Sequence, residues 1–199
     1  MNSKTQQLAQ HYPWPDQKPE VPEDFHGWCE VSQEKMFEQL VRPDMSVIVE
    51  LGTWLGKSTR LLLSMAPQAT VICVDHWLGS REHREDEELN KRLPTLYETF
   101  LVNLWDQRNQ VIPVRLTTLE ALEEIHQSQI VPDLIYIDAG HAYQDAWTDI
   151  STSLRLFPQS VICGDDWSWA GVRQAVQEIA EAHNKSIVLS DQQCWWFEQ

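Results

Sequence analysis

The sequence predicts an α/β fold built on a doubly wound, mostly parallel β-sheet with helices on both faces. Three observations lead to this prediction. Short apolar runs rich in β-branched residues recur along the chain, stretches with helical spacing separate them, and 42% hydrophobic residues in a chain of 199 supply one sizeable core. A regular alternation of strand and helix is typical of parallel sheets that are covered on both faces.

Seven apolar runs are the expected strands. Each is short and is bounded by polar or turn-forming residues. The last two runs are joined only by residues 191–193, and so short a connection predicts a hairpin with an antiparallel last strand. The expected strands are 47–51, 70–75, 110–115, 133–138, 160–165, 186–190 and 194–198.

Apolar residues between the strands recur at the spacing of a helix. The longest of these stretches, 84–105, carries leucine or phenylalanine at every third or fourth position after residue 88. A further helix begins near Ser32, before the first strand, and Pro43 ends it. The helices expected between strands span 57–65, 84–105, 118–127, 142–156 and 170–183.

The N-terminal stretch differs from the rest of the chain. Four of the ten prolines lie in the first 22 residues, among polar residues without an apolar period, which predicts an arm or loop. We therefore expect an N-terminal arm over residues 1–28 and one domain over residues 29–199. The segment 24–28 (DFHGW) could cover a ligand pocket or mediate self-association as a homo-oligomer, and the sequence leaves both open.

The charge of the chain limits its partners. Thirty acidic residues against 15 basic ones give a net charge of −15. Such a surface repels phosphate backbones and anionic lipids, so we expect neither a nucleic-acid nor a membrane partner. The chain has no apolar run of membrane-spanning length, its start lacks the features of a signal peptide, and its four cysteines form no C-x-x-C pair. These features predict a cytoplasmic protein without a zinc knuckle or a disulfide framework.

Acidic residues end most of the expected strands. They are Glu50, Asp75, Asp138, and Asp165 with Asp166. In a doubly wound sheet the ligand site lies at the carboxyl ends of the strands, near the point where the strand order reverses. We therefore expect these carboxylates to converge on one edge of the sheet.

The loop after the first strand, ELGTWLGKS (50–58), has the glycines of a ligand-binding turn. Its final Gly-Lys-Ser matches a phosphate-binding Walker loop, but Leu51 stands where that loop needs its first glycine. A dinucleotide fingerprint fails as well, because Trp54 replaces the middle glycine. A P-loop-like nucleotide hydrolase or kinase stays an alternative, since an apolar strand ending in Asp138 imitates the second Walker element.

The remaining pattern, E-x-G-x-x-x-G-x-S, resembles the first motif of the class I S-adenosylmethionine-dependent methyltransferases, which have a Rossmann-like fold. In that family the acidic residue here at Glu50 orients the methionine end of the cofactor through the loop, and Gly52 leaves room for it. Asp75 matches the acceptor of the ribose hydroxyls, because a carboxylate accepts two hydrogen bonds at once. The resemblance implies cofactor contacts from Glu50, Gly52, Thr53, Trp54, Gly56, Ser58, Asp75, His76, Trp77, Thr118 and Asp138, with His76, Trp77 and Thr118 beside the adenine.

Three carboxylates indicate a metal. Consecutive strands across a helix usually lie side by side, which brings Asp138, Asp165 and Asp166 within reach of one point. Like charges at such a point must be partly protonated or bound by a cation, and oxygen ligands select hard divalent ions. We therefore infer Mg²⁺ or another hard divalent cation as a second cofactor.

Two aspartate motifs resemble one branch of these methyltransferases. I-D-x-x-H-x-Y, followed by G-D-D-W, is similar to the macrocin-type sugar O-methyltransferases and to relatives labelled cephalosporin hydroxylase, over residues 28–199. In this resemblance Asp138, Asp165 and Asp166 match the magnesium ligands. The relatives commonly have Asp-Gly-Asp in the first motif, where this chain has Asp138-Ala139-Gly140 and lacks the second carboxylate.

The expected reaction needs a base. Methyl transfer to a hydroxyl requires partial deprotonation of the oxygen, which a metal assists by lowering the pKa of the hydroxyl. His141 is the candidate base and Asp138 its catalytic partner, although His141 could instead only order Asp138 or cap the following helix. The sequence thus predicts a metal-dependent O-methyltransferase for a small-molecule, sugar-like hydroxyl. A non-catalytic cofactor-binding protein is a further alternative.

Overall fold

The computed structural model describes residues 1–198, so Gln199 of the expected domain lies outside the described residues. Its strands form a single sheet in the order third, second, first, fourth, fifth, seventh and sixth along the chain. The strands are β1 (Val47–Leu51), β2 (Thr70–Val74), β3 (Val111–Val114), β4 (Leu134–Ile137), β5 (Val161–Gly164), β6 (Ile187–Ser190) and β7 (Cys194–Phe197).

The predicted fold class is confirmed. Strands β3, β2, β1, β4 and β5 are parallel neighbours, and β7 pairs antiparallel with both β5 and β6. The strand order reverses between β1 and β4, which places the expected ligand site at their carboxyl ends. The β-branched residues that predicted β1 and β2 are buried throughout, because helices cover both faces of the sheet.

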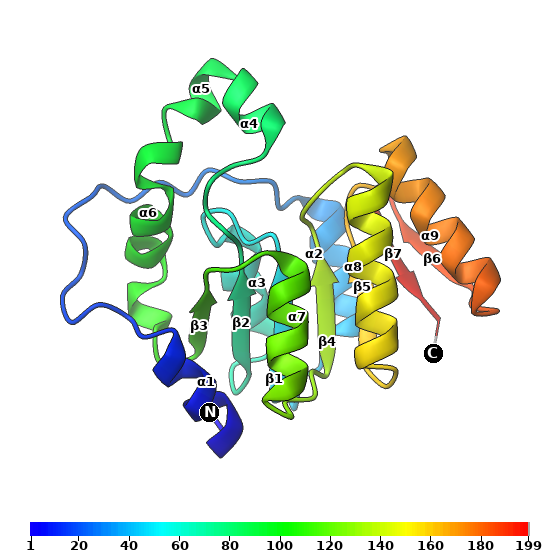
Figure 1. Ribbon diagram of the computed structural model, residues 1–199, viewed down its shortest axis with the longest axis horizontal. Helices are drawn as coiled ribbons and strands as arrows, with labels where there is room; N and C mark the ends of the chain where they lie inside the picture. The colour runs from blue at the N-terminus through cyan, green and yellow to red at the C-terminus, as the bar shows by residue number, and fades with distance from the viewer. Residues whose placement is uncertain (199) are drawn as a thin grey trace.

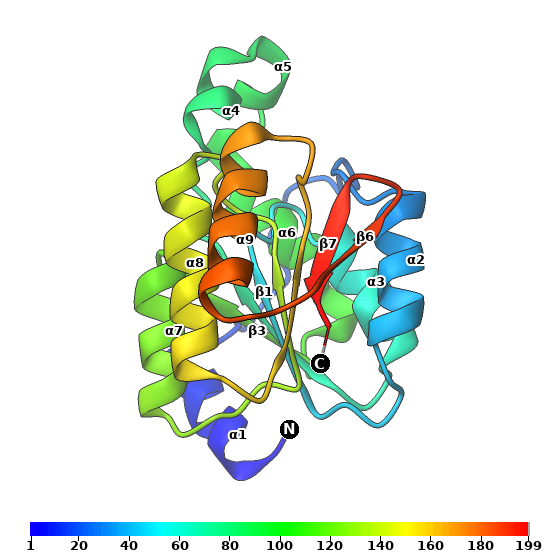
Figure 2. The same ribbon diagram turned by 90° about the vertical axis from the view of Figure 1, so that its right-hand side faces the viewer.

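Helices form one layer on each side of the sheet (Figures 1 and 2). Helices α7, α8 and α9 cover one face, whereas α2 and α3 cover the other. In the described part of the chain, no helix combines the length and apolar character needed to cross a membrane. The helices are α1 (Ser3–His11), α2 (Val31–Leu40), α3 (Lys57–Met65), α4 (Arg81–Glu85), α5 (Glu87–Asn90), α6 (Leu96–Asn103), α7 (Thr118–Gln127), α8 (Tyr143–Leu156) and α9 (Ala170–Ala182), with 3₁₀ turns η1 (Leu93–Thr95) and η2 (Trp105–Gln107).

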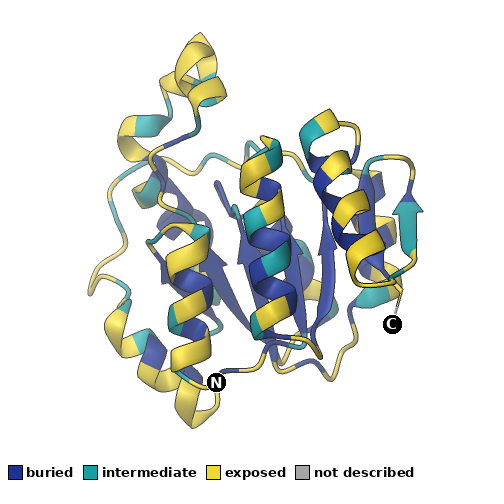
Figure 3. Ribbon diagram, turned by 45° about the vertical axis from the view of Figure 1, so that its right-hand side comes forward, coloured by how far each residue is buried: buried dark blue, intermediate teal, exposed yellow. Residues whose placement is uncertain are grey.

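The prediction of one helix over 84–105 was wrong. The stretch is divided into α5, η1, α6 and η2, and it is preceded by α4. Asp86 interrupts the helix, because its side chain accepts hydrogen bonds from Glu88 N and Leu89 N and so starts a new turn. Pro94, at the start of η1, supplies a second break. The short helices α4 and α5 project beyond the carboxyl edge of the sheet, where they are largely exposed (Figures 1 and 3).

The N-terminal stretch contains a helix, α1, that the sequence did not predict. Its buried face consists of Thr5 and Leu8, too few apolar residues to give a period. After α1 the arm contacts the sheet, because Trp14 Nε1 donates a hydrogen bond to Val111 O of β3 at 2.9 Å. Farther along, Asn103 Nδ2 donates to Asp24 O at 2.7 Å, which ties the arm to α6 before it reaches α2.

Candidate active site

The loop after β1 presses against the end of β4. Gly52 has φ +87°, and a Cβ atom there would lie 1.8 Å from the carbonyl oxygen of Asp138. Gly56, with φ +82°, takes the left-handed conformation that begins α3. Glycine at position 52 therefore allows the main chains of two neighbouring strand ends to touch, which brings the loop against the end of β4, at the edge where the ligand site of such sheets lies.

Glu50 lies beneath this loop and is completely buried. Ser58 Oγ donates to its Oε1, and Thr59 Oγ1 donates to its Oε2 at 2.5 Å. Burial raises the pKa of Glu50 to about 7, although these hydrogen bonds favour the ionised form. Through these two hydrogen bonds Glu50 thus holds the first turn of α3 in place. A carboxyl group at this helix N-terminus disfavours the binding of a phosphate.

Asp75 follows β2 and holds the same loop from the side. Its Oδ2 accepts a hydrogen bond from Trp54 N at 3.0 Å, and its Oδ1 accepts one from Trp77 N at 2.7 Å. Burial raises the pKa of this carboxyl. Each oxygen retains a further lone pair, so the side chain suits a ligand with two adjacent hydroxyls, as in ribose.

The structure brings four of the predicted cofactor residues close to Asp138 or to one another. Gly52 touches Asp138, and Trp54 is bonded to Asp75. Thr53, between them, is buried with its hydroxyl 3.5 Å from Val74 O. These contacts join the ends of β1, β2 and β4 into one constellation.

Three other predicted cofactor residues lie differently. Trp77 is only 2% exposed and donates from Nε1 to Trp54 O, so it supports the loop from the core. Thr118 Oγ1 donates to Asp149 Oδ1 at 2.5 Å and thus turns toward α8. His76 is exposed, and its Nδ1 accepts from Leu78 N. Stacking of Trp77 on an adenine does not follow from this placement, and the adenine contacts stay a prediction.

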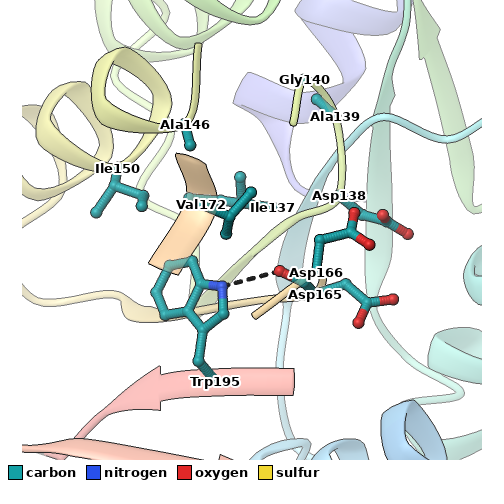
Figure 4. Close-up of a pocket in the computed structure, with 10 residues that line it drawn as sticks. All are labelled: Ile137, Asp138, Ala139, Gly140, Ala146, Ile150, Asp165, Asp166, Val172 and Trp195. Carbon is teal, nitrogen blue, oxygen red and sulfur yellow. Dashed lines mark hydrogen bonds between the residues drawn. The ribbon is translucent and has the colours of Figure 1, made fainter. Parts of the chain in front are cut away.

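The predicted cluster of carboxylates forms at the ends of β4 and β5. Asp138, Asp165 and Asp166 line one small pocket, which we call the carboxylate pocket (Figure 4). Its remaining lining is mostly apolar and includes Trp195, whose indole donates to Asp165 O at 3.0 Å. Burial, followed by the charges of Asp165 and Asp166, raises the pKa of Asp138 well above its usual value.

Protein donors engage all three carboxylates. The hydroxyl of Tyr136 donates to Asp138 Oδ2 at 3.0 Å. Gln33 Nε2 donates to Asp165 Oδ2, and Cys194 Sγ lies 3.4 Å from Asp165 Oδ1. His141 Nε2 lies 3.0 Å from Asp166 Oδ2, and this hydrogen bond raises the pKa of His141. The predicted base, His141, is therefore hydrogen-bonded to Asp166, a predicted metal ligand. This bond connects the loop after β4 to the loop after β5.

The carboxylate pocket as it stands does not fit a bound Mg²⁺ ion. Within residues 1–198, no group of three His, Cys, Asp or Glu residues is arranged to hold a metal. Asp165 faces Gln33 and Cys194, and Asp166 faces His141, so their oxygens are directed at different partners.

The sequence analysis missed a cluster of aromatic rings beside Asp75. His83 of α4 lies 4.4 Å from Trp54 between ring centroids and stacks on Trp28 at 5.7 Å. Trp54 Nε1 also lies 3.4 Å from His26 Nδ1. The aromatic residues of segment 24–28 were the signal for this cluster in the sequence. The sequence could not show, however, that this segment lies against α4.

Comparisons with known proteins agree with this geometry. Residues 49–167, more than half of the chain, match the family described as a methyltransferase domain. A Staphylococcus aureus protein described as a caffeoyl-CoA O-methyltransferase has a similar structure, with TM-score 0.61, 16% identity, and coverage of 100% of this chain and 93% of that one. A Bacillus cereus O-methyltransferase in complex with SAH gives TM-score 0.60 and 18% identity, covering 100% and 92%.

A third solved structure is the TDP-rhamnose 3′-O-methyltransferase CalS11 of calicheamicin biosynthesis, with TM-score 0.55, 15% identity and coverage of 82% and 76%. No curated protein matches the chain. The family match decides against a P-loop-like nucleotide hydrolase or kinase, as does Lys57, whose Nζ donates to Gly27 O at 2.9 Å. The matched residues extend from β1 to the GDDW motif after β5. The chain therefore belongs to the methyltransferase-domain family and is a class I S-adenosylmethionine-dependent methyltransferase.

Proposed function

We propose that this protein methylates a hydroxyl group of a small, sugar-like molecule with S-adenosylmethionine. The observation that carries the proposal is the meeting of the glycine loop, Asp75 and Asp138 at the sheet edge where His141 lies. A net charge of −15 supports a small acceptor over a nucleic acid.

The chain's own residues fit the cofactor. Gly52 lets the loop lie directly against the end of β4, and Asp75 has two oxygens that can accept the ribose hydroxyls. Glu50 and Ser58 hold the loop and the first turn of α3 in place from beneath, while Gly56 allows its turn. When bound, S-adenosylmethionine would supply a methyl group on a positively charged sulfur; an oxygen nucleophile would attack the methyl carbon in line as the S–C bond breaks and S-adenosylhomocysteine leaves.

His141 is the proposed proton acceptor. Its Nε2 faces Asp166, so Nδ1 is the atom that takes the hydroxyl proton as the new C–O bond forms. Asp166 orients the imidazole and stabilises its protonated form, as a carboxylate does in other acid–base pairs. Asp138, in the same pocket, is placed to position the hydroxyl because its Oδ2 already accepts from Tyr136 at 3.0 Å and its Oδ1 stays available.

Binding of S-adenosylmethionine tests the core of the proposal. Calorimetry should show binding to the unmodified chain, and Asp75→Asn should weaken it about tenfold or more, since an amide no longer accepts through both of its polar atoms. His183→Asn, an exposed change at the end of α9, is the matched control and should bind normally. Absence of binding at millimolar cofactor would refute the proposed function.

The predicted dependence on Mg²⁺ needs its own experiment. If the three carboxylates rearrange to hold the ion in the complex with cofactor, turnover should fall on chelation and return with Mg²⁺. Asp165→Asn together with Asp166→Asn should then abolish Mg²⁺ binding in calorimetry. Full turnover in the presence of a chelator would refute metal dependence and leave the methyltransferase proposal intact.

A further inference from the structure

Two stacked tryptophan–histidine pairs lie near the predicted base. Trp169 lies 4.5 Å from His141 between ring centroids with an interplanar angle of 23°, and it is 46% exposed. Trp28 stacks on His83 at 5.7 Å and 9°, and it is 48% exposed. Each tryptophan therefore has one face against a histidine and a large part of its surface in solvent, which leaves much of the indole accessible to another ring.

The charges around these pairs are predominantly negative. Asp166, Glu82 and Asp165 are the charges that act most strongly on His141. Asp75 acts most strongly on His83, and His141 is next, so the two pairs share one electrostatic environment. Together with the carboxylate pocket, these acidic side chains make the surface around His141 and His83 repel an anion and attract a cation.

The cations on the bordering elements are engaged with the protein itself. Recognition of a phosphate needs arginine or lysine donors, or an open helix N-terminus, directed at it. Arg84 Nη2 donates to Gly79 O at 3.0 Å, Arg173 Nη1 to Trp167 O at 3.3 Å, Lys57 Nζ to Gly27 O at 2.9 Å, and Arg92 Nε to Asp24 Oδ2 at 2.8 Å. These contacts direct the four side chains toward the arm and the loops of the protein.

We infer that the acceptor is a hydroxylated ring without a phosphate, either neutral or amine-bearing, that packs against the exposed edges of the stacked pair Trp169 and His141. This inference rests on the proposed function and concerns the same site. It separates this chain from two of its structural neighbours, which are named for a CoA-linked and a TDP-linked acceptor, both strongly anionic. A ring that contacts the edges of both Trp169 and His141 would present its hydroxyl to the imidazole, whose side chain is 25% exposed.

The experiment compares matched acceptors on protein loaded with cofactor. The pairs are methyl rhamnoside against TDP-rhamnose, and dopamine and catechol against caffeoyl-CoA. Transfer of a labelled methyl group gives kcat/KM, and calorimetry on protein saturated with S-adenosylhomocysteine gives Kd. We expect at least one phosphate-free compound to exceed its carrier-linked partner by about tenfold or more in kcat/KM, because like charges in contact cost several kcal/mol.

Two tryptophan variants test the contact with Trp169. Trp169→Ala should raise KM about fivefold or more for the accepted compound while kcat changes less than about twofold, since an aromatic contact contributes about 1 kcal/mol of binding. Trp147→Ala, at an exposed position on α8 with no histidine stacked on it, should change neither constant.

Three results would overturn the inference: a carrier-linked compound that exceeds its free partner, binding of no phosphate-free compound at millimolar concentration, or a Trp169→Ala variant that behaves like Trp147→Ala. Failure to bind S-adenosylmethionine would instead refute the proposed function, so the two outcomes are distinguishable.

Discussion

Nε2 of His141 lies 3.0 Å from Oδ2 of Asp166, a hydrogen bond that joins the loop after β4 to the turn after β5. Asp166 reaches this position with a left-handed backbone, φ +65°, which a residue other than glycine rarely adopts. The pair therefore combines an unusual conformation with a titratable histidine at the carboxyl edge of the sheet, a combination that is typical of functional sites.

Replacement of His141 should remove most of the chemistry and spare cofactor binding. We expect His141→Asn to lower kcat about 10²- to 10⁴-fold, the usual contribution of a general base, with the Kd for S-adenosylmethionine changed less than about twofold. Turnover assays and calorimetry measure the two effects. His183→Asn is again the matched control, and a kcat in His141→Asn equal to the control's would show that His141 only orders its neighbours.

The pH profile separates a base from a structural histidine. The hydrogen bond with Asp166 raises the pKa of His141, so a base at this position is neutral only at higher pH. Asp166→Asn should lower that pKa and move the acid limb of the kcat profile to lower pH, while the maximal kcat falls because the imidazolium loses its partner. An acid limb that stays in place would mean that a different group titrates in catalysis.

The loop after β1 should not tolerate a side chain at Gly52. A Cβ atom there would lie 1.8 Å from Asp138 O, in a conformation that favours glycine. Gly52→Ala should therefore lower Tm and weaken cofactor binding about a hundredfold or more, since the loop must move away from β4. Ser64→Ala, an exposed change on α3, is the control. Equal Tm and affinity in the two variants would contradict this account.

Much of the fold follows from local patterns in the sequence. Fully buried strands give continuous apolar runs, so every strand was predicted within two residues, including the pairing of β7 with β6. The convergence of Asp138, Asp165 and Asp166 followed from the parallel pairing of β4 with β5, which needs no side-chain detail.

What was missed depends on contacts between distant parts of the chain. Gln33 reaches Asp165 across 132 residues of sequence, and Trp28 reaches His83 across 55. The sequence analysis counted the three carboxylates without the donors that bind them, and the metal stays a prediction. The prediction of a continuous helix over 84–105 was wrong for a different reason, because the side chain of Asp86 competes for backbone N–H groups in a way that an apolar period does not register.

Removal of a carboxylate from the pocket should stabilise the fold. Asp138 is held among Asp165 and Asp166, and burial and their charges raise its pKa. Its contribution to stability is complete below the unfolded pKa and declines as pH rises, so Asp138→Asn should raise Tm at pH 8 by about 2 to 6 °C and by much less at pH 4. Turnover should fall in the same variant. Asp106→Asn, an exposed change with the same loss of charge, should leave Tm unchanged at both pH values.

A second buried carboxyl should make stability depend on pH away from the active site. Asp149 of α8 is buried and accepts from Thr118 Oγ1, and burial raises its pKa to about 7. Between an unfolded pKa of about 4 and this value, the folded protein retains a proton that the unfolded chain releases. The group's contribution to the free energy of unfolding is therefore complete below about pH 4 and is lost as pH rises toward 7.

Asp149→Asn keeps an acceptor for Thr118 and removes that titration. Relative to the unmodified chain, the variant should gain free energy of unfolding between pH 5 and pH 8, as measured by urea denaturation with m-values compared. Asp145→Asn, an exposed change on the same helix, is the matched control. If the free energy of unfolding changed equally with pH in both variants, the effect would come from net charge. A gain confined to Asp149→Asn would instead show that α7 and α8 are joined through a carboxyl that is protonated in the folded state.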